Sequence, residues 1–342
     1  MKKRIVYFDV LKVITCFMVI MVHVISRNWY VLDLKSNEFI FLTILDSICR
    51  CAVPIYLMIS GAIFLNEDKD MKIKDIFKKY ILNIFLIYLF WNMIYSVLSV
   101  LVYGNKLINV KVIKDIFVST ILGNGVFHLK FLVTILGFYL CVPFIRCITK
   151  KENRTLLQYL IVLLFIFTCT PSILTVFNIN LKYPILFTGF TLYFIFGYYL
   201  NTFEMNKKCR YIIYALGLIS LIITPILTIN YSNLNSIHSQ RFFEYGSFNI
   251  YLYSASLFLL FKNIFNKKEE TKVLNGLSKL YFGVYLIHGL VLGLLMKLNV
   301  FGLNMNLNIK TIIISCFVFI ISLIVSFVLS KIPFVKRLIY VK

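Results

Sequence analysis

The stretch VYFDVLKVITCFMVIMVHVI, residues 6–25, is long and apolar enough to span a membrane as a helix, but three ionisable residues interrupt it. An apolar segment of about 20 residues crosses a hydrocarbon core of roughly 30 Å. Asp9, Lys12 and His23 are the interruptions, and ionisable groups at such depth usually face a polar interior or a cavity. The stretch therefore predicts a helix that lines a polar path inside a membrane protein.

The rest of the chain has the same character. Of its 342 residues, 60% are hydrophobic and only 15% are charged, whereas soluble domains have roughly 25% charged residues. We expect an all-α, polytopic bundle of about ten transmembrane helices, formed by a single integral-membrane domain over residues 1–342. The ten predicted spans are about 5–27, 39–65, 80–103, 126–147, 156–176, 184–201, 211–230, 247–265, 281–298 and 309–330.

The net charge of +22 is distributed as topology signals are. Basic residues cluster in short connections between the apolar spans, and no nucleic-acid-binding motif accompanies them. We expect no nucleic-acid partner. Placing the N-terminus in the cytoplasm puts the C-terminus and roughly 24 of the 36 Lys and Arg residues on the cytoplasmic side. The four charged connections on that side are 66–79, 150–154, 206–210 and 266–272.

Lys12 and His23 share one face of the first span. Eleven residues at 100° each come within about 20° of three full turns, and they separate the two side chains by roughly 16 Å along the axis. Asp9 can pair with Lys12 across one turn. The alternative interpretation is that Lys12 extends to the cytoplasmic surface while His23 lies at the outer interface.

The second span contains a charged pair of its own. Asp46 and Arg50 are spaced i, i+4, which reduces the cost of placing Arg50 in the membrane. Pro54 deprives the Arg50 carbonyl of its helical partner and predicts a kink there. Ser60 and Gly61 permit close backbone approach near the cytoplasmic end. A purely structural ion pair between helices is the alternative.

Five further polar residues carry weaker predictions. His128 and Lys130 begin the fourth span, His288 lies within the ninth, and Arg241 and Glu244 lie in an external connection. Each has an ordinary explanation as an interfacial, packing or solvated residue. We keep them as candidates for the acceptor side of a site or for structural roles.

Several chemistries lack their sequence patterns. The histidines show no metal-ligand spacing, and the chain has no Walker loop, dinucleotide fingerprint or G-x-S-x-G elbow. We therefore expect no metal site and no bound cofactor. The eight cysteines are scattered through apolar segments, and we interpret them as small buried hydrophobic residues.

Four stretches, in order, resemble the acyltransferase-3 family of multi-pass membrane acyltransferases, which O-acetylate bacterial surface glycans. The family's motif of a basic residue and a histidine separated by ten residues is matched by Lys12 and His23. Its Arg-x-x-Val-Pro segment with a later Ser-Gly is matched by CRCAVPIYLMISGAIFL at 49–65. FHLKFL at 127–132 and YFGVYLIHG at 281–289 match the other two segments.

The chain departs from this pattern at three positions. Lys130 stands where tryptophan is commonest, Gly289 where proline is frequent, and Lys12 where arginine is usual. Lysine preserves the charge at position 12 but not a bidentate fork. We also expect no C-terminal extracytoplasmic esterase-like domain of the kind that some members carry.

The resemblance implies an O-acyltransferase of the cell membrane. Its donor would be a cytoplasmic acyl-CoA, most often acetyl-CoA as co-substrate, and its acceptor a glycan or lipid-linked saccharide hydroxyl. Such a hydroxyl needs a base, and the side chain of His23 has a suitable unperturbed pKa, so His23 is the expected catalytic base or acyl relay. The residues expected to bind the donor or to stabilise charge are Lys12, Arg50, Asp9, Asp46 and Ser60.

Two other functions remain open from the sequence. Ten helices with buried charges also suit a transporter or exporter of a glycan or small molecule, although no internal repeat is visible. A membrane sensing or scaffold module is the third interpretation. Turnover of acyl-CoA by the purified protein separates the enzyme from both alternatives.

Overall fold

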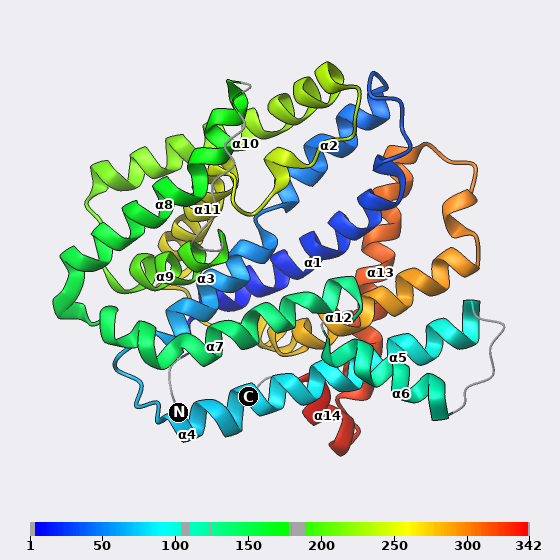
Figure 1. Cartoon of the computed structure of the whole chain (residues 1–342), viewed down its shortest axis with the longest axis horizontal. Coiled ribbons are helices and arrows are strands. Elements are labelled where there is room, and N and C mark those ends of the chain that lie inside the picture. The colour runs from blue at the N-terminus through cyan, green and yellow to red at the C-terminus, as the bar shows by residue number, and fades with distance from the viewer. Residues whose placement is uncertain (1–3, 104–109, 123–124, 178, 180–188, 341–342) are drawn as a thin grey trace. The chain divides into compact units, whose positions relative to one another are not determined.

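The computed structural model describes residues 4–103, 110–122, 125–177, 179 and 189–340 (Figure 1). Within these residues the chain folds into helices and contains no strand. Nine of the described helical segments are long and apolar enough to cross a membrane. The expected polytopic all-α membrane fold is therefore confirmed.

The nine segments coincide with nine of the ten predicted spans. They are Val6–Trp29, Asn37–Phe64, Ile73–Leu101, Phe127–Ile148, Lys151–Val176, Lys207–Asn235, Arg241–Phe265, Lys272–Lys297 and Leu307–Leu329. The remaining predicted span, 184–201, corresponds to α9 (Gly189–Thr202), which has 14 described residues. Residues 184–188 lie outside the part of the chain that the structure describes.

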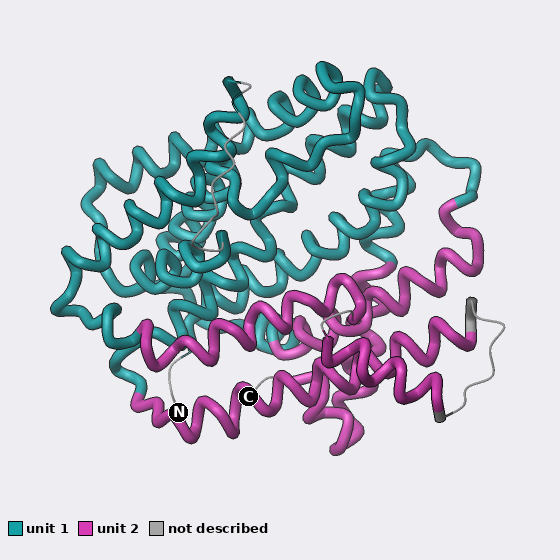
Figure 2. The backbone as a smooth tube through the Cα atoms, in the orientation of Figure 1, with its two compact units in different colours: residues 1–69, 146–278, 302–317 teal, residues 70–145, 279–301, 318–342 magenta. Residues whose placement is uncertain are grey.

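The chain divides into two compact units (Figure 2). Unit 1 comprises residues 1–69, 146–278 and 302–317, and unit 2 comprises 70–145, 279–301 and 318–342. The expectation of a single domain over the whole chain stays a prediction. Unit 1 contains α1 (Val6–Trp29), α2 (Asn37–Cys49), α3 (Ala52–Phe64), α8 (Arg154–Val176), α9, α10 (Lys207–Asn235) and α11 (Phe248–Phe265).

Unit 2 contains shorter elements as well as spans. Two short helices that the sequence did not predict are α6 (Val110–Ile121) and α14 (Pro333–Ile339). The other elements are α4 (Ile73–Asp75), α5 (Leu82–Tyr103) and most of α7 (Lys130–Ile148). The boundary between the units falls within α12 (Lys272–Lys297) and within α13 (Leu307–Leu329).

The second span is broken where the sequence predicted a kink. The last α2 residue is Cys49 and the first α3 residue is Ala52, so Pro54 occupies the first turn of α3, where its missing N–H costs no hydrogen bond. The Ile48 carbonyl, at the end of α2, accepts the Tyr253 hydroxyl at 3.4 Å. The break therefore divides one span into two helices, both of which pack against α1.

Charged connections gather at one end of unit 1. Contacts join the N-terminal residues to the connection 266–272, and the connections 66–79 and 150–154 to each other, in line with the positive-inside pattern. Which side of the membrane this end faces stays a prediction. The contacts are the ion pairs of Arg4 with Glu270 at 2.9 Å and Lys151 with Asp68 at 2.8 Å, and the Arg154 guanidinium 5.2 Å from the Phe203 ring centroid.

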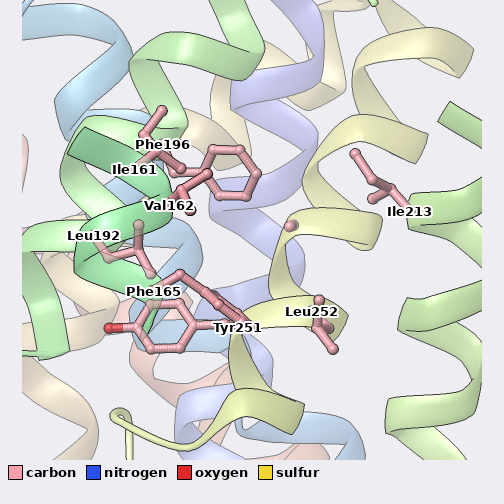
Figure 3. Close-up of a pocket in the computed structure, with 9 residues that line it drawn as sticks. Ile161, Val162, Phe165, Leu192, Phe196, Ile213, Tyr251 and Leu252 are labelled. Atoms are coloured by element: carbon pink, nitrogen blue, oxygen red, sulfur yellow. The ribbon is translucent and has the colours of Figure 1, made fainter. Parts of the chain in front are cut away.

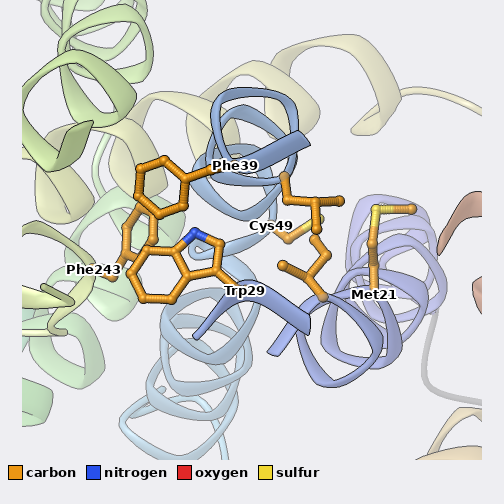
Figure 4. Packing of buried hydrophobic residues seen from close by; sticks show 7 residues of the cluster. Met21, Trp29, Phe39, Cys49 and Phe243 are labelled. Carbon is orange, nitrogen blue, oxygen red and sulfur yellow. The ribbon is translucent and has the colours of Figure 1, made fainter. Parts of the chain in front are cut away.

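A buried aromatic cluster joins α1 to α2 (Figure 4). Trp29, at the end of α1, packs against Phe39 of α2 and against Phe243 of the short η4 helix (Arg241–Phe243). Its indole N–H donates to the Thr43 hydroxyl at 2.9 Å. Large aromatic side chains dominate packing, and this indole satisfies its polar atom as well. The cluster fixes the end of α1 opposite the charged connections.

Two glycines bring α3 and α9 into backbone contact. A Cβ added at Gly61 would overlap the Phe194 carbonyl, and one at Gly197 would overlap the Met58 backbone. Small residues at helix crossings permit such close approach in membranes. The predicted role of Gly61 is confirmed.

The interpretation of the cysteines as buried residues is wrong for half of them. Cys16, Cys49, Cys51 and Cys169 are buried. The exposed ones are Cys141, Cys147, Cys209 and Cys316. In a membrane-spanning chain an apolar segment can face lipid, so apolar sequence context does not imply burial within the protein.

We predict that Gly61→Ala destabilises the protein, because its methyl group would displace the α9 backbone. Overpacking of this kind costs about 1–3 kcal/mol. The measurement is the midpoint of thermal or SDS unfolding of the purified protein. Gly137→Ala, within α7, is the matched control because its Cβ would meet nothing within 4 Å. Equal midpoints for the two variants would contradict the close-packing argument.

Candidate functional site

The first helix carries the charged pair that the sequence predicted. The Lys12 ammonium lies 3.2 Å from the Asp9 carboxylate, whose side chain is 5% exposed. Arg4 lies 3.8 Å from the other Asp9 oxygen. The Tyr56 hydroxyl of α3 donates to the Lys12 carbonyl at 3.2 Å. Asp9 is thus held between two cations, and α3 packs beside Lys12.

His23 lies on the same uninterrupted helix as Lys12. Because α1 continues unbroken from Val6 to Trp29, the predicted geometry of three turns and roughly 16 Å applies to the folded chain. His23 and Lys12 are both half-buried, whereas the intervening Cys16, Val19 and Ile20 are buried. Both ionisable side chains therefore lie on a less enclosed face of α1.

Asp46 and Arg50 form the predicted ion pair at the helix break. Their charged atoms are 2.5 Å apart, and the side chains are 3% and 10% exposed. Within the described chain, Asp46 Oδ1 and Arg50 Nε are buried and make no hydrogen bond. Buried polar atoms are nearly always bonded, so this pair retains capacity for a further polar ligand.

The surroundings of Arg50 include aromatic residues that sequence reasoning missed. The Arg50 guanidinium lies 4.5 Å from the centroid of the Phe243 ring, a cation–π contact. Tyr30, just after α1, lies within electrostatic range: burial raises the pKa of its phenol, and the positive charge of Arg50 opposes that shift. The i, i+4 spacing predicted the Asp46–Arg50 pair. No local sequence pattern connects Arg50 to Phe243, which lies far along the chain.

Contacts between helices set the depth of the break relative to α1. The Cys51 sulfur, directly after Arg50, lies 3.9 Å from the Met18 sulfur. Met18 lies between Lys12 and His23 along α1, about 9 Å from the level of Lys12 and about 7.5 Å from that of His23. Arg50 is therefore attached to a segment that packs against the middle of the Lys12–His23 interval.

The other predicted residues of unit 1 are less central. Ser60 is half-buried near the end of α3. Glu244 is exposed, and the Arg241 carbonyl accepts the Ser247 hydroxyl at 2.8 Å as part of a local turn. The connection between α10 and α11 reaches the ion pair through Phe243 rather than through Arg241 and Glu244.

Unit 2 brings together two histidines that the sequence treated separately. The rings of His128 and His288 are 5.0 Å apart, between centroids. His288 is 1% exposed, and its Nδ1 lies 2.6 Å from the Tyr285 carbonyl. A carbonyl only accepts, so the His288 Nδ1 carries the proton and donates this hydrogen bond. The Tyr285 hydroxyl in turn donates to the His128 carbonyl.

Gly289 makes the space for this histidine pair. A Cβ at this position would lie 2.6 Å from His128 Cε1 and 2.7 Å from the Tyr95 hydroxyl oxygen. That hydroxyl donates to the Leu286 carbonyl at 2.8 Å and accepts the Leu290 N–H at 3.1 Å, so it is fixed in place. Lys130, by contrast, is exposed at the first turn of α7.

Two cavities of unit 1 lie away from these residues. One, of about 260 Å³, is lined by apolar side chains of α8, α9, α10 and α11, with Phe165, Leu192 and Tyr251 among them (Figure 3). The other, of about 570 Å³, lies where α10 begins and α11 ends and has a mixed polar lining. None of the residues predicted for the site lines either cavity.

The comparisons with known proteins bear on this site. The family model described as an acyltransferase domain, acyltransferase-3, matches residues 5–331, which include every predicted site residue. No curated protein and no solved structure matches the chain. Because the match covers nearly the whole length, the chain belongs to the acyltransferase-3 family of multi-pass membrane acyltransferases.

Proposed function

We propose that the protein transfers an acyl group, expected to be acetyl, from cytoplasmic acyl-CoA to a hydroxyl of a cell-surface or lipid-linked glycan in the cell membrane. The observation that carries the proposal is the set of ionisable groups on α1 and at the α2–α3 break, inside the spans of a family acyltransferase. Stability alone gives no reason for such groups in a membrane, because buried pairs rarely repay their desolvation.

His23 is the proposed base. It would remove the proton of the acceptor hydroxyl as the oxygen attacks the thioester carbonyl, forming a tetrahedral intermediate. Collapse of that intermediate breaks the carbon–sulfur bond, and the departing CoA thiolate takes the proton from the His23 imidazolium. Acyl transfer through His23 itself is the covalent version of the same assignment.

Arg50 and Lys12 have different proposed roles because they lie at different depths relative to His23. Arg50, attached to the segment beside Met18, is the proposed partner of the developing oxyanion, for which a preorganised charge is most effective in a dry site. Lys12, roughly 16 Å from His23, is the proposed contact for a phosphate group of the donor. Asp9 and Asp46 hold these cations in place.

The histidine pair of unit 2 is the proposed acceptor side. The rings of His288 and His128 lie beside each other, and Tyr95 and Tyr285 add hydroxyl groups next to them. Sugar hydroxyls need such donors and acceptors for orientation. This assignment is independent of the role of His23.

The first prediction concerns His23. His23→Gln should lower kcat/KM for acyl transfer by about 10²–10⁴-fold, because general-base catalysis contributes that much. The assay measures transfer of radiolabelled acetyl from acetyl-CoA to purified glycan by the protein in nanodiscs. His238→Gln is the control, since glutamine can keep the 2.9 Å hydrogen bond to the Leu32 carbonyl. Undiminished activity of the His23 variant would remove it as base and as relay.

The second prediction separates catalysis from structure at the ion pair. Asp46→Asn and Arg50→Gln should each destabilise the protein by about 3–5 kcal/mol, because each leaves a buried charge unpaired. The double variant has no charge at either position, so it should recover most of that stability. The unfolding midpoints of the three variants measure this. Its acyl transfer should remain at least about 10²-fold reduced, as loss of one oxyanion contact does. Recovery of activity together with stability would show that the pair is only structural.

The third prediction tests the histidine pair. Gly289→Ala should displace the His128 ring and raise the KM for the acceptor, with little effect on the KM for acyl-CoA. Gly293→Ala, one turn later on α12, is the matched control because its Cβ would meet nothing within 4 Å. Steady-state kinetics in both substrates provide the measurement. An unchanged acceptor KM in Gly289→Ala would contradict the acceptor-side assignment.

A further inference from the structure

The cavity of about 570 Å³ in unit 1 lies outside the site described above. Its size is within the range of roughly 300–1,000 Å³ that is usual for small-molecule sites. It is formed where the chain leaves α9, enters α10 and ends α11, so it borders the charged connections 206–210 and 266–272. In the predicted topology these connections face the cytoplasm.

Its charges favour an anionic occupant. Arg210, Lys262 and Lys267 line the cavity, and Glu204 is the acidic residue among the lining side chains. Lys262 has a structural role, because its ammonium donates to the Leu200 and Asn201 carbonyls, at 2.7 and 2.9 Å, near the C-terminal end of α9. The positive charge that can bind an anion therefore comes from Arg210 and Lys267.

Arg210 is positioned and only partly engaged. Its guanidinium donates one hydrogen bond, to the Asn263 side-chain oxygen at 3.3 Å, and a guanidinium has five N–H donors. It lies in the first turn of α10, where the unpaired N–H groups make the helix end positive, and Asn206 caps that end. A planar fork beside a helix N-terminus suits phosphate oxygens.

Two tyrosines line the same cavity. The rings of Tyr211 and Tyr214 are 6.3 Å apart, edge to face. Asn263 donates to the Tyr214 hydroxyl at 2.5 Å, which fixes that ring. Tyr211 also lines the cavity and is 65% exposed. The cavity therefore combines cations with an aromatic surface.

We propose that this cavity binds a phosphate-bearing ligand, with the phosphate held by Arg210 and Lys267 and the rest of the molecule against Tyr211 and Tyr214. Two sources carry this chemistry: a nucleotide, such as the phosphoadenosine part of acyl-CoA, and the headgroup of an anionic phospholipid. The site itself follows from the cavity, and only its identification with the donor rests on the proposed acyl transfer.

The nucleotide source is tested with adenosine 3′,5′-bisphosphate. Its Kd is measured by calorimetry on the full-length protein in phosphatidylcholine nanodiscs. Arg210→Gln/Lys267→Gln should bind at least about tenfold more weakly than the wild type. Lys207→Gln/Lys208→Gln removes the same charge from exposed residues of the same connection and should stay within about twofold. Lys267→Glu, at an exposed position, serves as a second variant should the first pair fail to fold.

The lipid source is tested in the same variants. Phosphatidylglycerol in the nanodisc should raise the unfolding midpoint of the wild type and the control but not of Arg210→Gln/Lys267→Gln. Either selective response supports the proposal and identifies the source. If neither probe distinguishes the two double variants, the proposal is overturned.

These readouts need no turnover, so they are independent of the acyl-transfer proposal. His23→Gln should bind the bisphosphate as the wild type does. If the wild-type protein binds the bisphosphate through Arg210 and Lys267 but catalyses no acyl transfer, the proposed function is rejected and the binding site is retained.

Discussion

The cost of holding charges inside a membrane-spanning bundle determines much of this structure. Arg50 is tolerated because Asp46 neutralises it one turn away and Phe243 presents a ring face to its guanidinium. The same requirement pairs Lys12 with Asp9 and places Arg4 nearby. Lys12 shares α1 with Asp9, and Arg50 directly follows α2, which carries Asp46, so neither cation depends on a distant segment for neutralisation.

Helix packing then gives these groups fixed positions. Trp29 anchors one end of α1 against α2, and the Tyr56 hydroxyl holds α3 beside Lys12. Gly61 and Gly197 let α3 and α9 meet at the backbone, a contact that no larger residue allows. Rigid supports of this kind are what a proton-transfer site requires, because small displacements of a base are costly in rate.

The sequence predicted the features that depend on local spacing. Nine of the ten spans, the shared face of Lys12 and His23, the Asp46–Arg50 pair and the break before Pro54 all follow from helical periodicity and hydrophobicity, and the described residues confirm this geometry. Contacts between segments far apart in the chain were missed. Phe243 beside Arg50 and the pairing of His128 with His288 are decided by which helices pack together, and single-sequence periodicity carries no information about that.

The interruption at residues 50 and 51 has a mechanical consequence. Helix α2 belongs with α1 through the Trp29 cluster, whereas α3 belongs with α9 through the two glycines. Because α3 also packs against α1, beside Lys12, the joint between α2 and α3 is held on the continuous helix that carries Lys12 and His23. Arg50 lies at this joint, so a change in the angle between α2 and α3 would move its guanidinium relative to both of those side chains.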